Sequence, residues 1–100
     1  MDQPSTEFVK HISKKCKEYN TCLIADEVQS GFGRTGDFFG FQMHKINPDI
    51  ICMAKGMGNG FPVGGILIKD HIKSSFGMLG TTFGGNHLAC SAVLSVLKTL

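Results

Sequence analysis

The sequence lacks three features that would each point to a broad class of protein: a long apolar run, a strong excess of one charge, and closely spaced cysteines. Its longest apolar run, residues 62–68, is interrupted by Gly64 and Gly65, which excludes a membrane span. Ten Lys and Arg against eight Asp and Glu give a net charge of +2, too small to indicate a nucleic-acid or membrane-surface partner. Residues 1–4 contain no basic region leading into an apolar stretch, so no secretory signal is expected.

The four cysteines and four histidines are scattered along the chain. There is no Cys-x-x-Cys pair, and no histidine stands at ligand spacing from a cysteine or another histidine. A disulfide framework or a zinc site needs such spacings. We therefore expect free thiols, a reducing cytoplasmic compartment and no bound metal.

The apolar pattern predicts an α/β fold. Three short apolar runs read as strands buried on both faces, as in a parallel sheet, and two longer segments have helical periodicity. Three buried strands need more cover than two helices supply, so we expect a piece of a larger α/β protein. The predicted strands are residues 21–25, 50–54 and 65–68, the predicted helices run from Ser5 or Thr6 to about Tyr19 and from Asn86 onward, and short helical turns are expected within 38–44 and 70–76.

Thirteen glycines, gathered mainly in three loops, are the unusual part of the composition. One loop contains Gly31-x-Gly33-x-x-Gly36, which matches the dinucleotide-binding fingerprint. Its context does not fit, because the preceding strand ends in two carboxylates and residues 37–40 make a poor start for a long helix. We interpret the match as chance. The nucleotide alternative predicts NAD binding that survives replacement of Lys55 by Ala.

Asp26 and Lys55 form the most informative pair in the sequence. Each follows a continuously apolar run, and the carboxyl ends of parallel strands form the ligand-binding edge of an α/β sheet. A lysine at that position is expected to be partly desolvated, which favours its uncharged, nucleophilic form and Schiff-base chemistry. The alternative is a structural ion pair between the two side chains.

Pyridoxal phosphate requires both groups: a lysine to hold its aldehyde and an acid to keep its ring nitrogen protonated. Gln29 is placed to donate to the phenolate oxygen of such a cofactor, and Val28 to pack on its ring. Thr81 and Thr82, before two glycines, offer hydroxyls and amides to a phosphate, although their spacing alone favours a helix N-cap region. Arg34 has the simpler interpretation of a surface loop charge.

Three segments resemble motifs of the class III, or ornithine-type, aminotransferases. The three segments occur in the same order as in that family. The sequence of the third segment, residues 80–86, is most similar to that of acetylornithine and succinylornithine aminotransferases. Leu79 and His87 depart from the residues that many relatives have there, and this leaves the subfamily open. The segments are LIADEVQSGFGRTG at 23–36, PDIICMAKG with GFPVGG at 48–56 and 60–65, and GTTFGGN at 80–86.

The resemblance implies that residues 1–100 are part of the large domain of a fold-type-I transferase dependent on pyridoxal phosphate, a mostly parallel sheet with flanking helices. It implies that Lys55 forms the Schiff base and moves the proton, and that Asp26 binds the pyridinium nitrogen. Gln29 approaches the phenolate oxygen and Val28 packs on the ring. Glu27 belongs to the same cofactor-binding motif.

The resemblance also implies a homodimer, in which Thr82 binds the phosphate of the neighbouring subunit and Thr81 lies near the substrate. The implied reaction carries the terminal amino group of an N-acylated ornithine, or a similar ω-amine, to 2-oxoglutarate in arginine and ornithine metabolism. Ornithine aminotransferase, another ω-aminotransferase and a non-catalytic fragment of the same fold are the alternatives. The family's other cofactor and substrate contacts lie outside these 100 residues, so the isolated chain is expected to be inactive.

Overall fold

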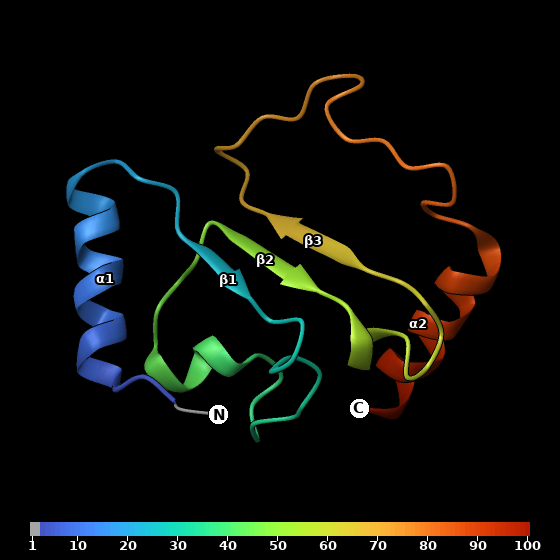
Figure 1. Cartoon of the computed structure of the whole chain (residues 1–100), viewed down its shortest axis with the longest axis horizontal. Coiled ribbons are helices and arrows are strands. Elements are labelled where there is room, and N and C mark those ends of the chain that lie inside the picture. Colours follow the sequence, from blue (N-terminus) through green and yellow to red (C-terminus); the bar gives the residue numbers. More distant parts are fainter. Residues whose placement is uncertain (1–2) are drawn as a thin grey trace.

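Three strands form the single sheet of the computed structural model, which describes residues 3–100 (Figure 1). They are β1 (Ile24–Asp26), β2 (Ile50–Met53) and β3 (Gly65–Ile68), in the order β1-β2-β3. β1 and β2 are parallel, as expected, whereas β3 runs antiparallel to β2. A parallel partner needs a long crossover, usually through a helix, but residues 54–64 contain only one 3₁₀ turn. The mostly parallel sheet that we expected is therefore mixed within this chain.

Two helices flank the sheet, and each begins at a residue that caps it. α1 (Thr6–Glu18) starts after Ser5, whose Oγ accepts a hydrogen bond from the Phe8 amide at 3.2 Å. α2 (His87–Thr99) starts after Asn86, whose Oδ1 accepts from the Ala89 amide at 3.0 Å. Both helices match the ranges that the sequence predicts.

Short 3₁₀ turns make up the rest of the regular structure. They are η1 (Gly40–His44), where a short helix is predicted, and η2 (Lys55–Met57), directly after β2. The helical turn predicted within 70–76 does not form as a helix; one hydrogen bond, from the Ile72 amide to the Lys69 carbonyl, closes a turn there. Among the described residues, neither α1 nor α2 has the length and apolar content that a membrane-spanning helix requires.

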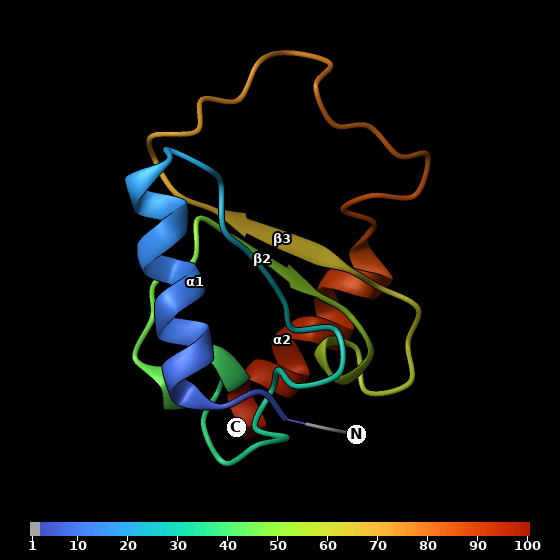
Figure 2. The same ribbon diagram turned by 60° about the vertical axis from the view of Figure 1, so that its left-hand side comes forward.

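The strands are less buried than the sequence predicts. Ile24 is 56% exposed and Leu67 is 51% exposed, and Met53 is the only buried residue in the three strands of the described chain. α1 packs mainly against η1 and α2 against η2, so the two helices leave much of the sheet uncovered (Figures 1 and 2). The prediction of strands buried on both faces is therefore wrong for this chain by itself.

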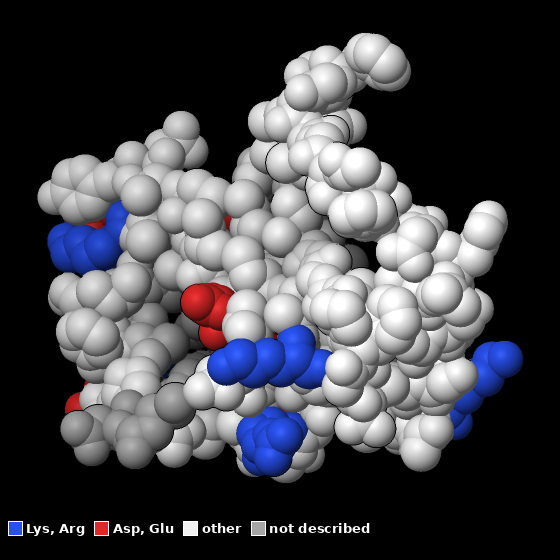
Figure 3. Space-filling model, turned by 45° about the vertical axis from the view of Figure 1, so that its right-hand side comes forward, with Lys and Arg blue, Asp and Glu red and all other residues white. Residues whose placement is uncertain are grey.

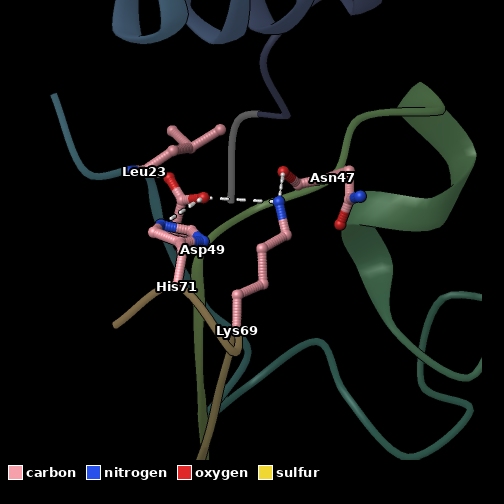
Figure 4. Close-up of polar contacts among 5 residues, drawn as sticks. All are labelled: Leu23, Asn47, Asp49, Lys69 and His71. Atoms are coloured by element: carbon pink, nitrogen blue, oxygen red, sulfur yellow. Dashed lines mark hydrogen bonds and ion pairs between the residues drawn. The ribbon is translucent and has the colours of Figure 1, made fainter. Parts of the chain in front are cut away.

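Asp49, directly before β2, ties the three strands together at one end of the sheet (Figure 4). Its Oδ2 accepts from the Leu23 amide at 2.9 Å, next to β1, and its Oδ1 accepts from Lys69 Nζ at 3.3 Å, next to β3. His71 Nε2 lies 3.6 Å from the same Oδ1, and Lys69 Nζ also donates to the Asn47 carbonyl at 2.9 Å. The Asp49 carboxylate thus helps to set the register in which Ile24 faces Ile50.

We expect Asp49→Asn to destabilise the protein in a pH-dependent way. The hydrogen bond from Leu23 lowers the pKa of Asp49 below its usual 3.8, with smaller contributions from Lys69 and His71, against an opposing effect of desolvation. A lowered pKa stabilises the fold above pH 3.8, and that stability is lost as the pH falls through the folded-state pKa. The free energy of unfolding of the variant should be about 1 kcal/mol below that of the parent near neutral pH. In strong acid, where Asp49 is protonated in both states, the two proteins should be equally stable.

The measurement is urea unfolding of both proteins between about pH 6 and about pH 2.5. Asp70→Asn, at an exposed position close by, is the matched control. If the difference in the free energy of unfolding between the parent and Asp49→Asn is the same at every pH in this range, the stabilisation does not come from the charge of Asp49.

Candidate functional site

The parallel pairing of β1 and β2 brings Asp26 and Lys55 to the same edge of the sheet. Asp26 is the last residue of β1 and lies opposite Cys52, while Lys55 follows the end of β2 by two residues and begins η2. The Glu27 amide donates to the Cys52 carbonyl at 2.9 Å, so the pairing extends to the end of both strands. This is the placement that the sequence predicts for the two side chains.

No ion pair joins Asp26 to Lys55 among the residues that the structure describes. Asp26 is exposed, and its Oδ1 accepts a hydrogen bond from the Val28 amide at 3.1 Å. This contact turns the chain at the end of the strand. The ion-pair alternative therefore has no support in the geometry, and both charged groups remain available at the sheet edge.

Lys55 has a strained backbone and an exposed side chain. Its φ of 44° lies in the left-handed region, which costs a residue with a side chain roughly 1–2 kcal/mol. Strain of this kind is concentrated at functional sites, where the surrounding structure holds it in place. The predicted desolvation is wrong within this chain, because the Lys55 side chain is exposed.

Val28, Gln29 and Lys55 line one cavity of about 370 Å³, which is large enough for a small molecule. Arg34 and the glycine-rich loop at 31–33 complete its wall. Arg34 is exposed in the loop, as its interpretation as a surface loop charge predicts, and it also lines this cavity and two neighbouring ones. Its position between Gly33 and Gly36, in a loop after a strand that ends in carboxylates, is the sequence signal for this lining role. Charged side chains are few on the face drawn in Figure 3.

The glycine-rich loop lies against η2 at Gly56, where a side chain would crowd Phe32, and the loop is itself closely packed at Gly31. A Cβ on Gly56 would stand 3.3 Å from the Phe32 Cβ, and a Cβ on Gly31 would stand 2.9 Å from the Glu27 carbonyl oxygen. The loop and η2 therefore form adjoining walls of the cavity. The dinucleotide alternative requires a long helix after Gly36, but the next helical element is the five-residue η1.

Glu27 does not line the cavity. Its side chain is buried, at 3% exposure, and its carboxylate accepts hydrogen bonds from Ser30 and from the amides at the start of η1. Successive residues of an extended chain point to opposite sides, which separates Glu27 from its neighbour Asp26. The contacts of Glu27 in this chain are with the loop and η1, and the cofactor-binding role that the resemblance implies for it stays a prediction.

Thr81 and Thr82 lie in the long exposed loop between β3 and α2, away from the cavity that Lys55 lines (Figures 1 and 2). The Thr81 carbonyl accepts from the Gly84 amide at 3.4 Å. The N-cap of α2 is Asn86, so the N-cap alternative for the two threonines is wrong. Their contacts to a phosphate and a substrate, across a subunit interface, stay predictions.

A family model described as aminotransferase class-III matches residues 1–100. The chain belongs to the class-III aminotransferase family. It is 46% identical over 99 residues to the acetylornithine aminotransferase of Methanopyrus kandleri, and 50% identical over 93 residues to that of Halalkalibacterium halodurans. These alignments cover 97% and 91% of this chain but 25% and 24% of the relatives. The chain thus spans about a quarter of the length of the curated relatives it matches.

Solved structures of aminotransferases have the same fold over nearly the whole chain. The ornithine δ-aminotransferase of Plasmodium falciparum superposes with a TM-score of 0.88 at 36% identity, covering 95% of this chain and 26% of that one. An S-selective transaminase from Arthrobacter superposes with a TM-score of 0.89 at 36% identity, covering 97% and 22%. The chain is therefore a piece of a fold-type-I aminotransferase fold, and the family implies pyridoxal phosphate as the cofactor.

The residues present fit this cofactor. The Lys55 amine and the Asp26 carboxylate lie at one edge of the sheet. The cofactor needs an amine for its aldehyde and a carboxylate for its ring nitrogen. Lys55 shares its cavity with an amide side chain, Gln29, and an apolar one, Val28. The cavity also contains the cation Arg34, which suits a negatively charged ligand.

Proposed function

We propose that this chain is the lysine-bearing part of an aminotransferase that moves the terminal amino group of an N-acylated ornithine to 2-oxoglutarate. The observation that carries the proposal is the parallel register of β1 and β2, which places Asp26 and Lys55 at the same sheet edge. The acetylornithine aminotransferases among the relatives support the choice of donor and a place in arginine and ornithine metabolism.

Bound pyridoxal phosphate supplies an aldehyde that takes up an amino group and a ring that accepts electrons. The Lys55 amine would hold the aldehyde carbon while no substrate is bound. Once released by the substrate, Lys55 Nζ would remove the proton from the substrate carbon that bears the amino group and return it on the cofactor side. One residue thus serves as nucleophile and as general base.

The other residues would bind and orient the cofactor. The Asp26 carboxylate would keep the ring nitrogen protonated, Gln29 would donate to the phenolate oxygen, and Val28 would pack on the ring. Thr82 would bind the phosphate of the partner subunit in a homodimer, with Thr81 near the substrate. The exposed position of the two threonines, on a loop that extends from the body of the chain, is compatible with a contact to another subunit (Figure 1).

Ornithine aminotransferase is the second candidate, favoured by the structural similarity to the Plasmodium enzyme. The two candidates differ in the group on the α-carbon of the substrate, at the opposite end from the terminal amine that is transferred. An acylated ornithine presents a neutral amide at its α-nitrogen, whereas free ornithine presents a second ammonium. A substrate comparison therefore separates them directly.

The test uses the purified full-length protein loaded with pyridoxal phosphate. We expect a yellow protein that consumes N-acetylornithine or N-succinylornithine with 2-oxoglutarate at a kcat/KM at least tenfold above that for ornithine. Borohydride reduction followed by peptide mapping should place the label on the peptide that contains Lys55. A preference for ornithine would select the second candidate. A colourless protein that takes up no cofactor would identify a non-catalytic remnant and contradict the proposal.

A further inference from the structure

Glu27 is a buried acidic group that the proposed reaction does not use. Its Oε2 accepts from Ser30 Oγ at 2.6 Å and from the Gly40 amide at 2.8 Å, and its Oε1 accepts from the Phe41 amide at 2.8 Å. The side chain is only 3% exposed. A buried carboxylate needs hydrogen-bond donors to both of its oxygens, and Ser30 Oγ and the two amides supply them.

The backbone of Glu27 is held as firmly as its side chain. Its amide donates to the Cys52 carbonyl of β2, and its carbonyl accepts from the Gly31 amide, both at 2.9 Å. One residue therefore joins β2, the beginning of the glycine-rich loop and the start of η1. The loop leaves Glu27 at one end and returns to its carboxylate at the other.

The packing around the carboxylate leaves little room for rearrangement. A Cβ on Gly40 would lie 3.0 Å from the Ser30 Cβ and 3.3 Å from Glu27 Oε2. Within the loop, Phe32, Phe38 and Phe39 contact one another, with ring centroids 4.8–6.3 Å apart. The loop is thus held both by the polar contacts of Glu27 and by contacts between aromatic rings.

We propose that Glu27 is a positioning residue, whose carboxylate clamps residues 28–41 so that Val28, Gln29 and Phe32 line the cavity beside Lys55. The inference rests on the proposed function, because the cavity matters only if it receives the cofactor. Glu27 acts at a distance: it touches the loop and η1 and is absent from the cavity wall. Glu27 therefore affects whether Val28, Gln29 and Phe32 are already in place before the cofactor binds.

Glu27→Gln is the informative change, because it preserves size while replacing one acceptor oxygen by an NH₂ group. Whichever way the amide turns, a donor faces the Gly40 or Phe41 amide, and that contact is lost. In the cofactor-free protein we expect the amides of residues 37–44 to exchange with deuterium roughly tenfold faster. The Kd for pyridoxal phosphate, from absorbance titration, should rise roughly tenfold, with kcat at saturating cofactor within about twofold of the parent.

Two further variants complete the experiment in the full-length protein. Glu18→Gln, on the exposed end of α1, is the matched control and should leave the exchange and the Kd unchanged. Ser30→Ala removes one donor but leaves both backbone contacts, so its effects should be in the same direction and smaller. If Glu27→Gln does not fold, Ser30→Ala carries the test, and unchanged exchange and Kd in that variant would overturn the proposal.

The outcomes separate the clamp from other roles. A raised Kd with unchanged exchange would mean that Glu27 contacts the cofactor directly, and it would overturn the clamp. Unchanged values for both would also overturn it. If the parent protein binds no pyridoxal phosphate, the proposed function fails, but the exchange of residues 37–44 in the cofactor-free protein still decides whether Glu27 holds the loop.

Discussion

Replacing Lys55 by Ala is expected to reduce aminotransferase turnover by more than roughly 10⁴-fold, because the same amine acts as nucleophile and as general base. Lys55→Arg should be equally inactive, since a guanidinium keeps the charge but does not give up its proton. Lys55 is exposed, so the free energy of unfolding should change by less than about 0.5 kcal/mol. The measurements are kcat with the preferred donor and urea unfolding.

Lys45→Ala is the matched control for this change. Lys45 is also an exposed lysine with a left-handed backbone, at φ 54°, but it lies at the end of η1 and does not line the Lys55 cavity. Its replacement should leave kcat unchanged. Turnover by Lys55→Ala within tenfold of the parent would remove the central residue of the proposal, and NAD binding that survives the change would support the dinucleotide alternative.

Asp26→Asn should lower kcat by roughly 10²–10³-fold at saturating cofactor, which is the effect of removing one preorganised electrostatic group from an active site. Asn keeps the shape of the side chain, and its oxygen still accepts from the Val28 amide, so the turn after β1 is preserved. What the variant loses is the negative charge that keeps a ring nitrogen protonated. Steady-state kinetics and the absorbance spectrum of the bound cofactor measure this loss.

Asp37→Asn, an exposed acid in the same loop region, is the control for a general change of charge and should retain full activity. An Asp26→Asn variant as active as the parent at saturating cofactor would show that the carboxylate has no part in the chemistry. The structural ion-pair alternative predicts instead that Asp26→Asn and Lys55→Ala both lower the free energy of unfolding, without additivity in the double variant.

Much of the fold was predictable because local signals are strong at particular residues. Ser5 and Asn86 cap the two helices where the sequence places them, and the apolar runs at 50–53 and 65–68 form strands. The direction of β3 was not predictable from its own residues. It depends on whether the connection from β2 contains a helix long enough to cross over the sheet, and residues 54–64 form a turn.

The candidate site also has features that the sequence predicts and others that it does not. The sequence predicts that Asp26 and Lys55 share a sheet edge, and β1 and β2 pair in parallel as that requires. Arg34 is the exposed loop charge that the sequence predicts, but its place in the cavity wall was not predicted, and neither were the contacts of the Glu27 carboxylate with Ser30 and η1. Both findings concern where a loop returns to the body of the chain.

The amino-acid sequence alone determined where the two long helices and the three strands form and which chemical groups follow the strands, because these properties depend on neighbours a few residues apart. Only the tertiary structure decided which groups meet. The contacts of Glu27 with Gly40 and Phe41, and of Asp49 with Leu23, join residues well separated in the chain. Such contacts depend on the path of the loops between them, and the periodicity of a sequence contains no information about that path.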